Sequence, residues 1–167
     1  MNLKELRDTF TEDIDEDIGD TEFTGKATRL INRAYKELAK REELQKVISL
    51  TAVNNEVLKP ADFLKVVEIR YDGEPITYKL EGDKIIVPAD GEVNLLYQYT
   101  PENLVNDADV PLTNAANDEF IISYAKYLYL MIEEEVDRAQ LYKRECDTFS
   151  LVKPLRMTKT INVYGMW

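Results

Sequence analysis

Three aspartates near the start of the chain have the spacing of a metal-binding loop. Asp13, Asp15 and Asp17 alternate along TEDIDEDIGD, and carboxylates at alternate positions begin the calcium loop of helix–loop–helix proteins. That loop needs glycine at its sixth position and glutamate at its twelfth, but this chain has Ile18 and Thr24 there. We therefore expect a solvated acidic loop before a helix N-terminus, where the helix dipole favours negative charge, with no metal and no other cofactor.

Other side chains that carry catalysis are scarce. The chain has no histidine, so Ser-His and Cys-His pairs and His-containing zinc sites are excluded. Cys146 falls on the apolar face of a predicted helix, which is typical of an inert core thiol. The alternative is a metal-dependent nuclease around Asp13, Asp15 and Asp17, but these lie in one local loop with no catalytic lysine convergent in the sequence. We predict that the protein is not an enzyme.

The charge balance is acidic, with 32 Asp and Glu against 21 Lys and Arg. Ordinary DNA or RNA binding needs a basic surface that displaces counterions from phosphate, so such binding is disfavoured. A protein that surrounds DNA without binding it is compatible with this balance. The ten tyrosines could stack on bases, but without interleaved basic residues they are more typical of a core or a protein interface.

The length of 167 residues suits one domain with a hydrophobic core. No apolar run approaches the roughly 20 residues of a membrane span. The start, MNLKELRDTF, lacks the apolar region of a signal peptide, and the single cysteine cannot form an internal disulfide. We expect a protein that has no membrane segment and is made and used in a cytoplasm.

Two helices are predicted in the first 46 residues. Residues 2–10 place Leu3, Leu6 and Phe10 on one side, and residues 11–20 form the acidic loop. A longer helix begins near Thr21 and ends near Leu44 or Lys46. Its apolar residues recur every three or four positions: Phe23, Ala27, Leu30, Ile31, Ala34, Tyr35 and Leu38.

The middle of the chain changes to a period of two. Apolar residues alternate with polar ones from about 47 to 100, in short runs separated by turn sequences. The turns are Asn54-Asn55, Asp72-Gly73, Glu81-Gly82-Asp83 and Asp90-Gly91. This pattern predicts a compact antiparallel meander of four or five short strands.

A second helical region follows the polar loop 101–113. It begins near Asn114 and bends or breaks at Glu133–Asp137, where Asp137 could cap the second half; Pro154 ends it. The predicted buried face consists of Phe120, Ile121, Tyr124, Ala125, Leu128, Met131 and Ile132, continued by Val136, Ala139, Tyr142, Cys146 and Phe149.

The last segment, PLRMTKTINVYGMW, has no helical period and is rich in large apolar residues. A free terminus is usually polar and frayed, so this segment must pack on something. With the basic residue before it, the predicted docking arm contains Lys153, Leu155, Arg156, Met157, Lys159, Ile161, Val163, Tyr164, Met166 and Trp167. The alternative is that the segment folds back on its own domain.

These elements predict an α+β fold that is mainly helical. A helical bundle within domain 1–153 carries a small antiparallel sheet inserted at about 47–100, and residues 154–167 form an extended C-terminal docking arm.

The order of elements resembles a known family. A helix of the type TRLINRAYKELAKREEL precedes a small sheet that closes with GEVNLLYQYTPENL. The loop DADVPLTNAANDEF and the tyrosine-rich helix ISYAKYLYLMIEEEVDRAQLYKRECDTF follow. Over roughly residues 20–150 this organisation resembles the head-to-tail adaptor, or head-completion, proteins of tailed bacteriophages.

The resemblance implies a structural virion protein of the neck, or connector, assembled in the host cytoplasm. Such proteins form rings, usually of twelve copies, below the portal protein. Their helices form the ring body, the sheet faces outward or toward the downstream tail or stopper protein, and the arm docks on the portal. DNA passes through the channel without specific binding. The alternative is a neighbouring stopper or tail-completion connector, although stoppers are usually richer in strands.

Overall fold

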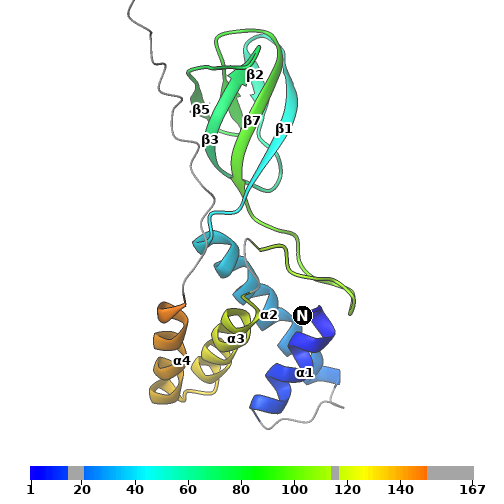
Figure 1. Cartoon of the computed structure of the whole chain (residues 1–167), viewed down its shortest axis with the longest axis vertical. Helices are drawn as coiled ribbons and strands as arrows, with labels where there is room; N and C mark the ends of the chain where they lie inside the picture. Colours follow the sequence, from blue (N-terminus) through cyan, green and yellow to red (C-terminus); the bar gives the residue numbers. More distant parts are fainter. Residues whose placement is uncertain (15–20, 114–116, 150–167) are drawn as a thin grey trace, which may run out of the picture.

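The computed structural model describes residues 1–14, 21–113 and 117–149. Within these ranges a body of helices and a body of strands lie end to end along the long axis of the molecule (Figure 1). The helices are α1 Leu3–Asp13, α2 Thr21–Arg41, α3 Asp118–Ile132 and α4 Val136–Thr148. The strands are β1 Gln45–Ala52, β2 Glu56–Leu58, β3 Phe63–Tyr71, β4 Glu74–Pro75, β5 Lys79–Glu81, β6 Lys84–Ile86 and β7 Gly91–Tyr99. The predicted α+β class is confirmed.

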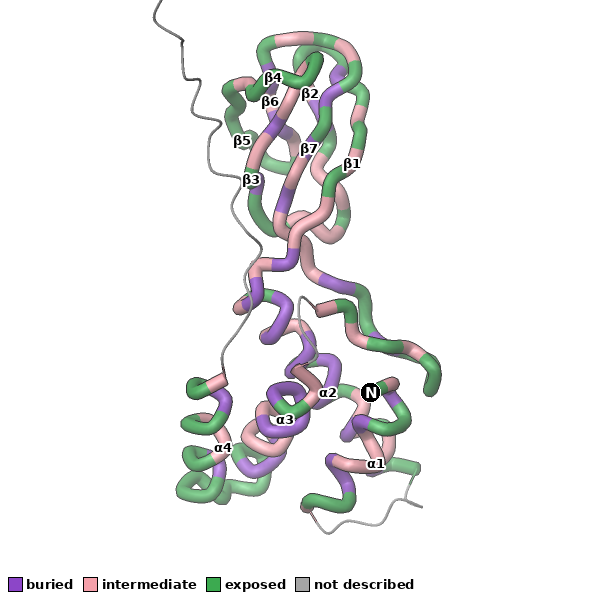
Figure 2. The backbone as a smooth tube through the Cα atoms, in the orientation of Figure 1, coloured by how far each residue is buried: buried purple, intermediate pink, exposed green. Residues whose placement is uncertain are grey.

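The helical body buries the apolar faces predicted for its first two helices. A capping box starts α1, in which Glu5 N donates to Asn2 Oδ1 at 2.9 Å and Asn2 N donates to Glu5 Oε2 at 2.8 Å. Helix α1 continues through Asp13, so the predicted loop is wrong over residues 11–13. The buried residues of all four helices form one core, seen as the inward-facing buried segments in Figure 2.

Helix α2 ends earlier than predicted, at Arg41 rather than near Leu44 or Lys46. Glu43 adopts a left-handed φ of 54°, and Leu44 N donates to Ala39 O at 3.1 Å. This six-to-one bond is the Schellman ending, in which a buried apolar residue follows the left-handed one. Leu44 is 4% exposed and leads directly into β1. The left-handed position after a helix is usually glycine, so the glutamate at position 43 did not indicate in the sequence that the helix ends there.

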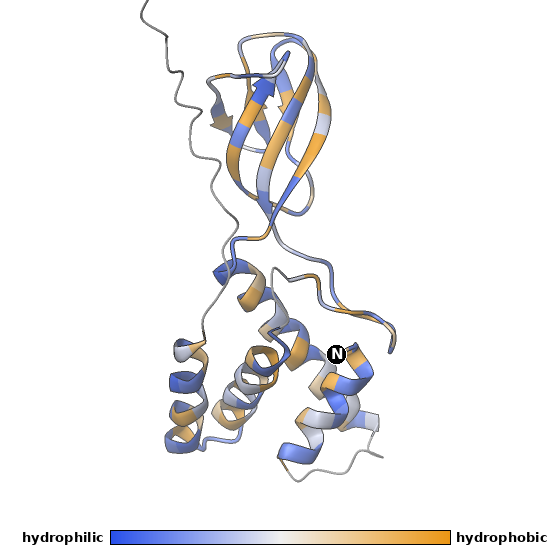
Figure 3. Ribbon diagram, in the orientation of Figure 1, coloured by the Kyte–Doolittle hydropathy of each residue, from blue (hydrophilic) through white to orange (hydrophobic). Residues whose placement is uncertain are grey.

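The strands form two antiparallel sheets and not a single meander. The four-stranded sheet has the order β1-β7-β3-β4, and the three-stranded sheet has the order β2-β6-β5. Strand β7 lies between β1 and β3, so the last strand in sequence is central in space. The two sheets share a separate core of Ala52, Val57, Val66, Ile69, Ile85, Val87, Val93, Leu95 and Tyr97. The alternation of apolar and polar residues along these strands is visible in Figure 3.

The predicted turns are confirmed at the tight hairpins. Asn54 and Asn55 have φ of 55° and 62°, and Val53 and Glu56 exchange two backbone hydrogen bonds across them. Asp72 and Gly73 also have positive φ, of 49° and 84°, and connect β3 to β4.

The break between α3 and α4 is confirmed, but its details differ from the prediction. Helix α3 begins at Asp118 rather than near Asn114, and α4 ends at Thr148, before Pro154. The N-cap of α4 is Glu135, and Asp137 lies in the first turn. The reversal occurs at Glu134, whose φ is 62°.

The buried face of α3 is shorter than predicted. Phe120, Ile121 and Ala125 are buried, whereas Met131 and Ile132 are 40% and 53% exposed. Tyr129 and Leu130 are the last buried residues of α3, and in the final turn only the two residues before the reversal, Met131 and Ile132, lie in solvent. Val136, at the start of α4, is also exposed.

Candidate interaction site

The residues predicted to form the docking arm lie outside the described residues, as does the predicted end of the domain at 153. The described surfaces that could bind a partner are therefore on the helices, the sheets and the loop that connects them.

Of the three aspartates whose spacing resembles a calcium loop, only Asp13 lies within the described residues. Asp13 belongs to the last turn of α1, and its Oδ2 pairs with Lys126 Nζ of α3 at 2.5 Å. The Lys126 side chain is 12% exposed, and its Nζ lies 5.2 Å from the centroid of the Tyr142 ring of α4. Asp15 and Asp17 lie outside the described residues. Within the described ranges no group of three or more Asp, Glu, His or Cys could hold a metal ion.

Cys146 is buried, as predicted. It is 1% exposed, and its Sγ lies 4.0 Å from Phe120 O. Burial raises the pKa of the thiol to about 12, so it stays protonated at neutral pH. A protonated, shielded thiol is a poor nucleophile, which fits a packing role.

The loop 101–113 is fixed to the helical body along its length. Asn32 of α2 bonds both backbone groups of Leu104, and Tyr35 Oη accepts from Leu112 N at 2.8 Å. Asp109 Oδ2 accepts from Val105 N and Asn106 N, and these two bonds hold the pKa of that carboxyl below its ordinary value.

The same loop also contacts α1. Leu3 N donates to Asp109 O at 2.8 Å, and Arg7 pairs with Asp107 at 2.5 Å. Despite these anchors the loop exposes three large apolar side chains: Val105 by 74%, Val110 by 58% and Leu112 by 66%. A loop that is held in place while exposing apolar side chains could bind a partner without first having to become ordered.

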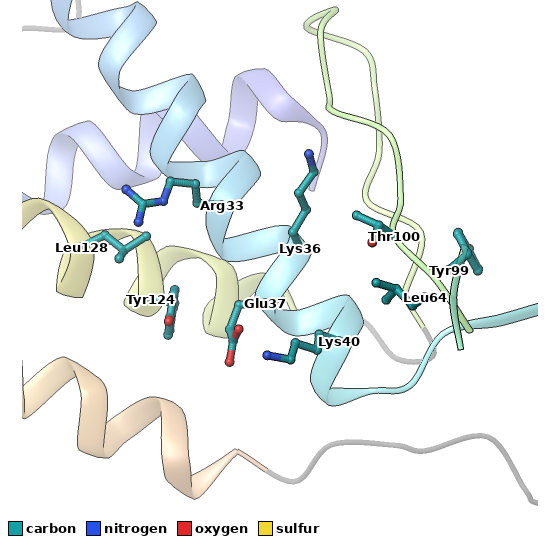
Figure 4. Close-up of a pocket in the computed structure, with 9 residues that line it drawn as sticks. All are labelled: Arg33, Lys36, Glu37, Lys40, Leu64, Tyr99, Thr100, Tyr124 and Leu128. Atoms are coloured by element: carbon teal, nitrogen blue, oxygen red, sulfur yellow. The ribbon is translucent and has the colours of Figure 1, made fainter. Parts of the chain in front are cut away.

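A cavity of about 340 Å³ lies where α2 and α3 meet the base of the four-stranded sheet (Figure 4). Its apolar wall comes from Tyr124 and Leu128 of α3 and from Leu64 and Tyr99 of the sheet. Burial raises the pKa of Tyr124, so its hydroxyl remains a neutral donor. We call this site the junction pocket; its remaining lining residues are Arg33, Lys36, Glu37, Lys40 and Thr100.

The rim of the junction pocket is basic, although the chain as a whole carries a net charge of −11. Arg33, Lys36 and Lys40 recur at the three- and four-residue spacing that places side chains on one helix face. None of the three makes an ion pair with another described residue. Glu37 lies among them and is paired at 2.9 Å with Arg41, which also pairs with Asp147 at 3.0 Å, so the lining has three cations against one carboxylate. The apolar period of this helix predicts only its buried face, so its basic face was not predicted, although the spacing of Arg33, Lys36 and Lys40 could have indicated it.

A second groove, of about 680 Å³, crosses the outer face of β1, β7 and β3. Its apolar residues are Val47, which is 62% exposed, Val67, which is 40% exposed, and Leu96. Lys65 and Arg70 line it as well. Like the junction pocket and the loop, it combines exposed apolar and charged groups, which is the composition of protein contact surfaces.

The family model described as SU10 adaptor protein matches residues 1–150, which cover both the helical body and the sheets. The chain belongs to the SU10 adaptor protein family. SU10 adaptor proteins are head-to-tail adaptors of phage virions, so the predicted family is confirmed. This is a family of structural adaptors and not of enzymes.

No curated protein matches this SU10 adaptor. In the part of the chain that the structure describes, no helix is both long enough and apolar enough to cross a membrane.

Proposed function

We propose that this SU10 adaptor forms a ring, of about twelve copies by analogy with phage adaptors, that joins the portal to the tail and encloses the DNA channel. The observation that carries the proposal is the family match over residues 1–150. The proposed partners are the portal protein, further copies of this chain and a downstream tail or stopper protein. Its place is the neck of the virion, after assembly in the host cytoplasm.

The charge distribution supports an annular role. All 32 acidic residues lie in residues 1–150, while 151–167 contain three basic residues and no acid. An acidic channel wall repels phosphate, so DNA could pass without binding to it. The basic, apolar segment 154–167 is proposed as the arm that docks on the portal, with residues 1–153 as the domain that carries it.

The exposed apolar surfaces also support assembly. The fixed loop exposes Val105, Val110 and Leu112, and the sheet groove exposes Val47 and Val67. Such groups are costly to leave in water and are typical of surfaces that become buried against other proteins.

The proposal is tested by mixing the purified chain with the portal ring from the same genome and imaging the mixture by negative-stain electron microscopy. We expect a second ring stacked under the portal, whose rotational symmetry gives the copy number. A bare portal with this chain free in excess would overturn the proposal and favour the stopper or tail-completion alternative.

The arm is tested by deleting residues 154–167 and comparing portal binding and thermal unfolding with those of the full chain. We expect an unchanged melting temperature and a loss of portal binding, because the deletion removes the apolar anchors and two of the basic residues. The matched control is Thr158→Ala with Thr160→Ala in the same segment, which should bind normally. A deletion that unfolds the protein would show that the segment packs on its own domain.

A further inference from the structure

The reversal between α3 and α4 presents apolar and acidic side chains together. Met131, Ile132 and Val136 are 40%, 53% and 49% exposed. Glu134, at the left-handed position, and Asp137, in the first turn of α4, lie beside them in the sequence and are exposed. We call these five residues the α3–α4 knob.

The knob keeps unpaired negative charge. Glu133 is paired with Lys26 at 2.6 Å, and Glu135 is paired with Arg138 at 2.5 Å. Glu134 and Asp137 have no ion pair among the described residues. The knob therefore combines three exposed apolar side chains with two uncompensated carboxylates.

The junction pocket has the opposite character in both respects. It is a cavity, whereas the knob is an exposed helix reversal, and its apolar wall includes Tyr124 and Leu128. Its rim carries Arg33, Lys36 and Lys40, which have no ion pair within the described part of the chain. Apolar groups at the centre of a contact with complementary charges at its rim are the usual anatomy of a protein interface.

The two surfaces cannot meet within one chain. The ion pair between Lys26 and Glu133 fixes the knob near the first turns of α2, whereas the pocket lies along its last turns. At a rise of about 1.5 Å per residue, Lys26 is about 10 Å along α2 from Arg33, the nearest cation of the rim, and about 21 Å from Lys40, and both surfaces belong to the same packed helices. Contact between knob and pocket therefore requires two copies of the chain.

We propose that the α3–α4 knob of one copy docks in the junction pocket of the next copy. Because the two surfaces are different patches of the same chain, the contact is head-to-tail, and repeated contacts of this kind close into a ring when the rotation per copy allows it. The inference rests on the proposed ring function and identifies the surface between neighbouring copies. The apolar knob residues would pack against Tyr124 and Leu128, and Glu134 and Asp137 would face the basic rim.

Charge reversal on each surface tests the contact. One variant reverses the knob, Glu134→Lys with Asp137→Lys, and another reverses the rim, Lys36→Glu with Lys40→Glu. A third carries all four changes and restores opposite charges. The control, Glu81→Lys with Glu92→Lys, makes the same net charge change as the knob variant at exposed residues of the sheets. Circular dichroism and thermal unfolding confirm that each variant is folded.

The readout is the number of copies bound per portal ring, measured by native mass spectrometry over a concentration series. We expect each two-residue reversal to raise the concentration needed for a full ring about tenfold or more, corresponding to about 1.4 kcal/mol per contact. The four-residue variant should recover most of this loss, and the control should behave as the wild type. Full rings at wild-type concentrations from both reversed variants would overturn this inference and leave the ring function standing. A wild-type chain that forms no ring on the portal would overturn both.

A cross-linking experiment tests the same contact by geometry. With Glu134→Cys and Lys36→Cys in one chain, a short bismaleimide should link neighbouring copies on the portal into a ladder of multimers. Chains with only one of these cysteines should yield no ladder, because buried Cys146 is not accessible. Absence of a ladder from the double variant, on portals that carry complete rings, would contradict the proposed contact.

Discussion

Asn32 and Leu104 exchange two hydrogen bonds although they are 72 residues apart in the chain. Asn32 Nδ2 donates to Leu104 O at 3.0 Å, and Leu104 N donates to Asn32 Oδ1 at 2.7 Å. Both residues are buried, so water cannot replace either bond. The side-chain amide of Asn32 thus bonds the backbone of Leu104 as a neighbouring β-strand would. It does so where the chain returns from the sheets to the helical body.

Replacing this amide should destabilise the protein. Asn32→Ala leaves the buried Leu104 N–H and C=O without partners, so we expect a loss of about 2–3 kcal/mol in the free energy of unfolding. The measurement is urea unfolding followed by circular dichroism. Asn103→Ala, at an exposed position in the same loop, is the control and should change stability by less than about 0.5 kcal/mol. An equally small effect of Asn32→Ala would show that these bonds do not hold the loop.

Stability should fall at alkaline pH. Burial raises the pKa of the Cys146 thiol from 9.0 to about 12, and burial also raises the pKa values of Tyr35 and Tyr97 above 10.0. Because these acids ionise more easily when unfolded, the stabilisation is complete below about pH 9 and is lost as the pH rises toward 12.

The cysteine contribution can be isolated by substitution. Cys146→Ala should be less stable at pH 7 because it leaves a small cavity, but its free energy of unfolding should fall less steeply between pH 9 and 10. Denaturant unfolding at a series of pH values measures both slopes. Equal slopes for the two proteins would contradict a raised pKa for this thiol.

The base of the sheet contains an ion pair that should stabilise the folded protein at neutral pH but not at low pH. Asp62 accepts a hydrogen bond from Tyr97 Oη at 2.9 Å and pairs with Lys46 Nζ. Burial opposes ionisation of Asp62, but the hydrogen bonds from Lys46 and Tyr97 outweigh it and lower its pKa below 3.8. Its stabilisation is therefore present above about pH 3.8 and is lost as the pH falls through the lower folded value.

Asp62→Asn should accordingly cost about 1 kcal/mol at pH 7, a modest amount because the pair is partly solvated. The difference from the wild type should shrink as the pH falls below 3.8. Urea unfolding at pH 7 and pH 3 measures it, with Asp72→Asn in the exposed β3–β4 turn as the control. A cost that stays constant over this range would argue that the charge of Asp62 is not involved.

Calcium should not change the protein. Asp13 is paired with Lys126 in a helix, and the sequence after it lacks the glycine and glutamate of a calcium loop. Titration with calcium should therefore give no heat by calorimetry and no shift in melting temperature. A saturable heat that disappears in Asp15→Asn with Asp17→Asn would show that the acidic segment binds the ion after all.

Much of the fold was predictable because it depends on local patterns. The apolar spacing of Leu3, Leu6 and Phe10, and the longer stripe from Phe23 to Leu38, correctly predicted which faces of α1 and α2 are buried. The turn pairs Asn54-Asn55 and Asp72-Gly73 correctly predicted the tight hairpins, in which all four residues have positive φ. The family was also recognisable, because its order of elements is a property of the sequence.

The errors arose where a distant part of the chain decides the outcome. Helix α2 stops at a glutamate in the left-handed conformation because Leu44 is buried there, and no local residue type indicates this ending. The meander was wrong because β7 pairs with β1 and β3 through contacts between residues far apart in the sequence, whereas turns specify only neighbouring strands.

By itself, the sequence determined the class of the fold and the absence of histidine chemistry, because composition and short-range periodicity encode these directly. The family entered as a resemblance in motifs and in the order of elements. Tertiary structure alone placed the basic face of α2 beside Tyr124, Leu128 and the base of the sheet, and left Met131 and Ile132 in solvent. Periodicity shows which side of a helix is apolar or charged, but which other element covers that side depends on how the whole chain packs.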